Sequence, residues 1–261
     1  MKRGWFFKVR VALLLSVLAI VVLYALKDVW RRRQRSDWTR ELQVALVIAH
    51  QGPVDRAALD ALRTEVPKLQ DRLNEEFRRY RGTGRPFSFV VYGPVPASVE
   101  PPKLATEGIL SLAKHAWALR RFVAALDERA DVPSAGFDSR LYLVVRAPKS
   151  QSRLFVEGMS EQGGRVGIAE AELDPTMPGF VLFVAAHELF HTLGATDKYD
   201  ERGLASVPAG LAEPELTPLY PQRYAEVMAR NRPIAPGVEE PPASIDELSV
   251  GAVTATEVGW K

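Results

Sequence analysis

Beyond its N-terminal segment, the chain alternates between short continuous apolar runs and longer stretches with helical spacing. Short runs rich in valine, leucine and isoleucine are typical of strands buried on both faces of a sheet. Such runs occupy residues 42–49, 87–92 and 141–145. The stretches at 56–81 and 105–129 repeat apolar residues every three or four positions, as amphipathic helices do. Strands that alternate with long helices predict an α/β fold with a twisted, mainly parallel sheet.

The second half of the chain begins with a weaker strand pattern. Residues 165–173 alternate between apolar and polar positions and include several charges, which favours an edge strand over a strand at the centre of a sheet. An apolar run follows at 180–186, and Pro178 suits the first turn of the helix that contains it. We therefore expect an edge strand directly before a buried helix.

The C-terminal part has a different character. Residues 205–245 show little periodicity and hold eight of the 19 prolines of the chain. This predicts a long irregular connection, of a kind that is often functional in a compact domain. Ser244 and Glu247 then form a capping-box pattern, which opens a predicted last helix through about Val258.

The N-terminal segment contains a candidate membrane span. Residues 11–26 carry no charge. Flanking apolar residues, among them Trp5 and Trp30, extend this run toward the roughly 20 residues that cross a membrane, and tryptophan suits both interfaces. A cleaved signal peptide is the alternative, but no clear small-x-small site follows the run. We predict an uncleaved single-pass anchor at 1–36 and one folded domain at 37–261.

The charge is distributed unevenly along the chain. The formal net charge is +2, yet residues 1–40 hold ten Lys/Arg against two Asp, and the rest holds 24 Lys/Arg against 30 Asp/Glu. The body is therefore mildly acidic, which argues against nucleic-acid binding. Basic residues flank the apolar run on both sides in nearly equal number, so the positive-inside rule does not decide the orientation. The absence of cysteine excludes disulfides and thiolate-bound zinc, and the oligomeric state stays open.

The buried helix carries the strongest chemical signal, the run HELFHTLGATDKYD that starts at His187. Residues four apart lie on one face of a helix, so His187 and His191 can direct both imidazoles at one metal ion. Glu188 lies beside them and can accept the proton of a zinc-activated water. Two of only four histidines fall at this spacing. The alternative, a core histidine next to a surface carboxylate, is the weaker interpretation.

The residues after the two histidines favour a particular third ligand. Gly194 can end the helix in a left-handed conformation, after which the chain turns back and Asp197 can reach the metal. A carboxylate oxygen is a normal zinc ligand. The rival third ligand is a downstream glutamate, as in His₂Glu sites. The candidates for that role are Glu213, Glu215 and Glu226.

The extended pattern HExxHxxGxxD resembles the signature of the metzincin clan of zinc peptidases, HExxHxxGxxH followed by a methionine turn. The sequence departs from that signature at Asp197, where most members have histidine. Snapalysin-like peptidases have aspartate at the matching position, and immune-inhibitor-A-like peptidases share a Gly-x-x-Asp-x-Tyr continuation, here Gly194 to Tyr199. The resemblance implies a metzincin-like fold and Zn²⁺ held by His187, His191 and Asp197.

The resemblance also assigns a methionine turn beneath the metal. Met228, 37 residues beyond His191, is the candidate. The alternative is a methionine in a short core helix around residues 220–229. Some metzincins have a tyrosine two residues after this methionine, but here that position is Arg230. Tyr199 or Tyr224 is a candidate to stabilise the oxyanion instead.

In metzincins, the strand before the active-site helix pairs with the backbone of the bound peptide. The matching residues, which we expect to bind substrate, are Gly167, Ile168, Ala169 and Glu170.

These inferences predict a membrane-anchored zinc metallopeptidase that hydrolyses peptide bonds in a protein or peptide substrate, with its catalytic domain outside the cytoplasm. The alternative is an inactive or non-peptidase relative, a membrane-tethered binding protein that keeps the fold. An intramembrane protease is a third hypothesis. It fails because the apolar run before His187 is far shorter than the roughly 20 residues that a span requires.

Overall fold

The computed structural model describes residues 2–102, 108–149, 156–160 and 162–261. Contacts between Cα atoms divide the chain into two compact units, Met1–Asp37 and Trp38–Lys261. The boundary falls one residue after the one expected from the sequence.

The first unit consists of helix α1, Lys2–Arg35. Within the described residues, α1 is the one helix that is long and apolar enough to cross a membrane. Its apolar window is not buried, and a signal sequence near an N-terminus has the same length and composition.

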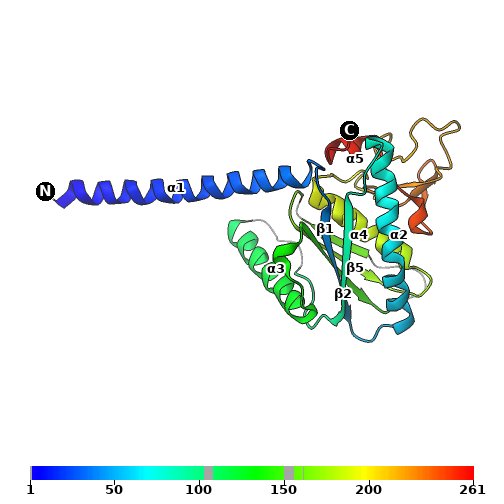
Figure 1. Ribbon diagram of the computed structural model, residues 1–261, viewed down its shortest axis with the longest axis horizontal. Helices are drawn as coiled ribbons and strands as arrows, with labels where there is room; N and C mark the ends of the chain where they lie inside the picture. Colours follow the sequence, from blue (N-terminus) through cyan, green and yellow to red (C-terminus); the bar gives the residue numbers. More distant parts are fainter. Residues whose placement is uncertain (1, 103–107, 150–155, 161) are drawn as a thin grey trace. The chain divides into compact units, whose positions relative to one another are not determined.

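The second unit is built on a five-stranded sheet in the order β2-β1-β3-β5-β4 (Figure 1). The first four strands in this order are parallel, and β4 pairs antiparallel with β5. The strands are β1 (Leu42–Gln51), β2 (Phe87–Pro96), β3 (Ser139–Arg146), β4 (Val156–Ser160) and β5 (Val166–Glu172). The prediction of a mainly parallel sheet is confirmed.

Three long helices cover the sheet: α2 (Arg56–Arg81), α3 (Ile109–Ala130) and α4 (Pro178–Leu193). Successive residues of a strand face opposite sides of a sheet. Val44, Leu46 and Ile48 of β1 accordingly belong to the core cluster that contains residues of α2 and α4. Ala45 and Val47 belong to a second cluster with residues of α3. Helices α2 and α3 therefore lie on opposite faces of the sheet (Figure 1).

The helix predicted at 56–81 has those bounds in the structure. Its N-cap residue Asp55 accepts a hydrogen bond from the backbone N–H of Ala57, and Gly82 follows its last turn with a φ of 78°. The helix predicted at 105–129 begins at Ile109, and residues 105–107 lie outside the described part of the chain.

The edge position predicted for residues 165–173 is wrong. Strand β5 occupies this segment, but β3 and β4 pair with it on its two sides. The charges that suggested an edge have another explanation. Glu172, at the end of β5, is buried, and one of its carboxylate oxygens lies 3.7 Å from Nε of Arg146 on β3. On this side of the sheet, the last described strand is β4, which the sequence pattern did not reveal.

The C-terminal part is mostly irregular, as predicted. Its short elements are β6 (Ala225–Glu226), β7 (Arg232–Ala235), β8 (Val238–Glu240), the 3₁₀ turn η2 (Ile245–Glu247), β9 (Leu248–Ser249) and α5 (Ala252–Glu257). Another 3₁₀ turn, η1 (Ser134–Gly136), precedes β3.

The single last helix predicted from Ser244 to Val258 is wrong in extent. Ser244 does accept a hydrogen bond from the N–H of Asp246, and the carboxylate of Glu247 accepts one from the N–H of Ala243. This capping box begins only a 3₁₀ turn. The next residue, Leu248, pairs with Ala225 of β6, so the chain is extended before α5 begins.

An aromatic cluster joins the two ends of the second unit and packs against α4. Trp260 is almost fully buried, and the rings of Trp38, Phe77, Phe87 and Phe190 have centroids 5.5–6.0 Å from its own. Phe190 belongs to α4, so this cluster packs the helix that carries the HExxH motif.

Candidate metal centre

Helix α4 positions the two histidines. Pro178 occupies its first turn, and the apolar residues at 180–186 are buried against the sheet and α2. The helix ends at Gly194, whose φ of 107° is left-handed and whose N–H bonds to the carbonyls of His191 and Phe190. A side chain is strained in that conformation, which explains glycine here. The predicted start and end of this helix are confirmed.

Three side chains converge on one point. The Nε2 atoms of His187 and His191 lie 3.1 Å apart, and Oδ1 of Asp197 lies 3.2 Å from each. Tetrahedral zinc with bonds of about 2.0–2.1 Å keeps its ligand atoms about 3.3–3.4 Å apart. The near-equilateral triangle therefore has nearly the spacing that three ligand atoms of one zinc ion would have.

Backbone carbonyls orient both imidazoles. Nδ1 of His187 lies 2.9 Å from the carbonyl oxygen of Val227, and Nδ1 of His191 lies 3.0 Å from that of Ala195. A carbonyl only accepts, so each Nδ1 carries the proton and donates it. The lone pair of each Nε2 is then left for a metal, as in most histidine-ligated sites.

Asp197 lies in the loop that follows Gly194. Burial alone would raise the pKa of Asp197, but the adjacent imidazoles of His187 and His191 hold the pKa well below its usual range. The residue is therefore a carboxylate at neutral pH, which is the form that binds zinc. The structure brings together the three side chains that the sequence predicted as ligands.

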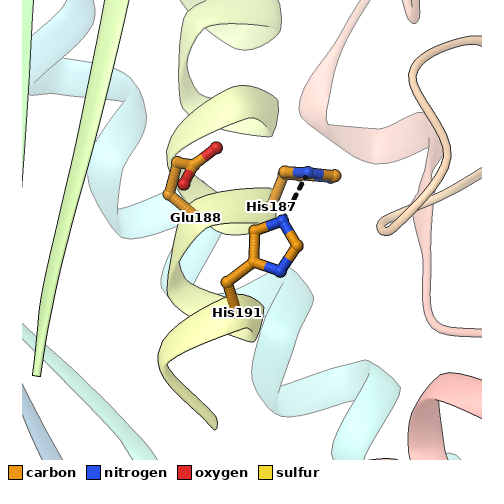
Figure 2. Close-up of side chains that lie close together, drawn as sticks. All are labelled: His187, Glu188 and His191. Carbon is orange, nitrogen blue, oxygen red and sulfur yellow. Dashed lines mark hydrogen bonds between the residues drawn. The ribbon is translucent and has the colours of Figure 1, made fainter. Parts of the chain in front are cut away.

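Glu188 lies beside the triangle on the same helix. Figure 2 shows its carboxylate next to the two imidazoles, and ligand atoms of the three residues lie within 4.8 Å of one another. The side chain is almost fully buried and accepts a hydrogen bond from the hydroxyl of Ser160. Burial raises the pKa of Glu188, although His187 and Ser160 oppose the shift. A raised pKa makes the carboxylate a stronger proton acceptor.

Met228 lies in a fully buried turn. The N–H of Ala229 bonds to the carbonyl of Glu226 across this turn, at 2.9 Å. The neighbouring carbonyl of Val227 is the one that orients His187. The described residues 220–229 form no helix, so the alternative of a short core helix around Met228 is not found.

The rival third ligands lie elsewhere. The carboxylate of Glu226 is fully buried and accepts hydrogen bonds from the N–H groups of Met228 and Gly251. Glu213 forms an ion pair with Arg223, and Glu215 is exposed to solvent. None of the three glutamates belongs to the described group of side chains around His187.

A cleft of about 1280 Å³ opens over the triangle. Strand β4 contributes Gly158, Met159 and Ser160 to its wall, and the hairpin β7–β8 contributes residues on another side. The substrate-binding prediction for Gly167, Ile168, Ala169 and Glu170 needs correction, because both edges of β5 are already paired. None of these four residues lines the cleft. Strand β4 borders the cleft and is the last strand of the sheet on this side, with no further described strand beside it.

The two candidate tyrosines have different surroundings. Tyr199 lines the cleft, and its ring stacks on His187 at 6.3 Å between centroids. Burial and the nearby Asp197 raise the pKa of Tyr199 to about 12, which keeps its hydroxyl protonated. The guanidinium of Arg230 lies 5.6 Å from this ring. Tyr224 does not line the cleft, and its ring packs against arginine instead.

Sequence reasoning missed Gly158 and Ser160. Both face Glu188 from β4, although they lie about 30 positions before it in the chain. The one local signal was their spacing of two, which places side chains on the same face of a strand.

Comparisons with known proteins find similarity to solved structures. No family model matches the chain, and no curated protein matches it. Archaemetzincin from Methanopyrus kandleri is similar in structure, with 19% sequence identity, a TM-score of 0.32, and coverage of 63% of this chain and 79% of that one.

Proposed function

We propose that this protein is a zinc-dependent metallopeptidase, with zinc held by His187, His191 and Asp197. The observation that supports the proposal most is the triangle of two Nε2 atoms and one carboxylate oxygen, 3.1–3.2 Å apart, at the floor of an open cleft. When bound, zinc supplies a Lewis acid that polarises the scissile carbonyl and acidifies water.

The chain's own residues supply proton transfer and orientation. Glu188 accepts a proton from the attacking water and returns it to the departing amine. Its raised pKa suits both directions of transfer. Tyr199 keeps its proton at neutral pH and donates a hydrogen bond toward the developing oxyanion. Val227 and Ala195 hold the histidine rings in place.

The edge of β4 that no described strand occupies binds the substrate in this proposal. A peptide that pairs with a sheet edge is held extended, and its carbonyls are placed at regular intervals along the strand. Because β4 lies in the wall of the cleft, such a peptide passes beside His187 and Glu188. The substrate class is accordingly an unfolded segment of a protein or a peptide.

We also propose that α1 anchors the enzyme in a membrane, with the catalytic unit outside the cytoplasm. Its length, its apolar window and the tryptophans Trp5 and Trp30 support a span. The acidic balance of the rest of the chain supports a protein substrate rather than a nucleic acid.

Glu188→Gln tests the proposed function. This substitution keeps the size of the side chain but removes the proton acceptor, so hydrolysis of a peptide library should fall by about 100- to 10,000-fold. Zinc content should stay at one ion per chain by elemental analysis. Glu240→Gln is the control, because Glu240 lies on β8 but does not line the cleft. Full activity in the Glu188 variant, or no zinc in the parent protein, contradicts the proposal.

A further inference from the structure

We infer that Ser160 and Gly158 of the edge strand β4 are positioning residues that fix the carboxylate of Glu188 for proton transfer. This inference rests on the proposed function, because it gives Glu188 the role of proton acceptor. It adds two residues that lie outside the HExxHxxGxxD motif and connects the base to the strand that borders the cleft.

The direction of the β4 side chains supports the inference. Positions two apart on a strand share one face, so 158 and 160 face the same side. Met159, between them, packs against the core cluster on the opposite face of the sheet. Gly158 and Ser160 therefore face the side of α4, where Glu188 lies.

Gly158 provides the space that the carboxylate occupies. A Cβ atom at this position would lie 1.8 Å from Oε1 of Glu188 and 2.6 Å from its Cδ. Both distances are far below van der Waals contact, so any side chain here would displace the carboxylate. The glycine is explained by this close approach rather than by a turn.

Ser160 provides the hydrogen bond that fixes the orientation. Its hydroxyl donates to Oε2 of Glu188, while the glycine accommodates Oε1. One oxygen is thus hydrogen-bonded to Ser160, and the other lies against Gly158. Hydrogen bonds to a charged group in a buried setting are the stronger class, so this contact restricts the carboxylate to one rotamer.

The turn after β4 holds the strand against the helix. The N–H of Gly163 donates to the carbonyl of His191 at 2.8 Å, and the side-chain amide of Gln162 donates to the carbonyl of Gly194 at 2.8 Å. These bonds connect the turn to the C-terminal end of α4, where the carbonyl of His191 also accepts from the N–H of Gly194. Strand β4 is therefore attached to the helix that carries the base, and a peptide on its edge is placed relative to Glu188.

Ser160→Ala should lower kcat by about 10- to 100-fold, the range expected when a buried charged group loses a hydrogen bond. KM should change little, because a peptide on the edge of β4 would pair with backbone groups that the substitution leaves in place. Zinc stoichiometry should not change, because the three ligands are intact. Ser160→Thr should restore most of the rate, since it keeps the hydroxyl. Gly158→Ala should lower kcat by at least as much, because it displaces the carboxylate.

Ser139→Ala is the matched control. Ser139 is buried on β3, and its hydroxyl lies 3.0 Å from that of Thr192 on the same helix α4, away from the cleft. The substitution removes the same group from a contact with the same helix. Its kcat should match that of the parent protein, even if its melting temperature falls.

Infrared spectroscopy tests the hydrogen bond without substrate. The difference spectrum of metal-free parent minus Ser160→Ala should show one shifted carboxylate band, which disappears when both proteins also carry Glu188→Gln. If the band is present but the parent protein hydrolyses no peptide, the proposed function is wrong, whereas the hydrogen bond between Ser160 and Glu188 is supported. An active parent with unchanged kcat in Ser160→Ala, or an absent band, would overturn the inference.

Discussion

At the scale of single residues, the site depends on a carboxylate where the metzincin signature has a histidine. Asp197 is shorter than histidine, yet its Oδ1 reaches 3.2 Å from both imidazole nitrogens because the chain turns back at Gly194. An anionic third ligand also offsets more of the charge of a divalent cation than an imidazole does. Position 197 therefore decides both the geometry and the charge of the metal centre.

Asp197→Asn tests this role. The amide keeps the shape but loses the negative charge, so zinc affinity measured by competition with a chelator should fall by more than about 100-fold, beyond the usual effect of an outer hydrogen-bond partner. Asp200→Asn is the control. Asp200 lies three residues on, where it pairs with Arg202, and its loss should leave zinc affinity unchanged. Equal affinities in both variants would remove Asp197 from the ligand set.

The sequence predicted the local part of the site and missed its long-range part. His187, His191 and Asp197 lie within eleven positions of each other, so helical spacing and one glycine were enough to bring them together. Ser160 reaches Glu188 only because β4 pairs with β5 and β5 packs against α4. That contact depends on the order of the strands in the sheet, which the spacing of apolar residues along the chain does not show.

At the scale of elements, the C-terminal helix α5 supports the ligand loop. The carboxylate of Glu257 accepts hydrogen bonds from the N–H and the hydroxyl of Thr196, and it forms an ion pair with the buried Lys198 at 2.8 Å. The backbone N–H of Lys198 also bonds to the carbonyl of Met228. Asp197 lies between the two anchored residues, so α5 and the Met228 turn together hold the third ligand.

Glu257→Gln should destabilise the fold by about 1–3 kcal/mol at pH 7, because it leaves the buried ammonium of Lys198 without its charged partner. Burial tends to raise the pKa of Glu257, but the contacts with Lys198 and Thr196 lower it below the ordinary 4.5. The stabilisation is thus present above pH 4.5 and is lost as the pH falls through the lower folded-state pKa. Urea unfolding at several pH values checks this. A difference between the two proteins that grows on acidification would contradict it.

Elements whose ends depend on nearby residues were predicted correctly, whereas those that depend on long-range pairing were not. Helix α2 has the predicted bounds because its caps, Asp55 and Gly82, are local features. The last helix was overestimated because the capping box at Ser244 is real but the following residues pair with β6. Strand β5 was misplaced because its charge at Glu172 suggested solvent, whereas the side chain is buried near Arg146.

At the scale of the whole molecule, the chain consists of an apolar helix and a unit with its own core. The second unit contains both core clusters, the aromatic cluster around Trp260 and all predicted metal ligands. We therefore expect that folding and the proposed metal binding do not require α1, whose apolar window is not buried.

Residues 38–261 expressed alone should be soluble, bind one zinc and unfold at the same temperature as the full chain. The full chain should sediment with lipid vesicles and resist extraction with alkaline carbonate, because a span of roughly 20 apolar residues inserts stably. Sedimentation and calorimetry on both proteins provide the comparison. A full chain that is released by carbonate would argue against the anchor, and an unfolded fragment would argue against independent units.

The proposed function requires that His187, His191 and Asp197 hold a zinc ion. Diffraction from zinc-loaded crystals on both sides of the zinc absorption edge tests it most directly. We predict one anomalous peak about 2.0–2.2 Å from both Nε2 atoms and from a carboxylate oxygen of Asp197. A peak ligated by another carboxylate such as Glu213, or no peak between the two histidines, would contradict the account.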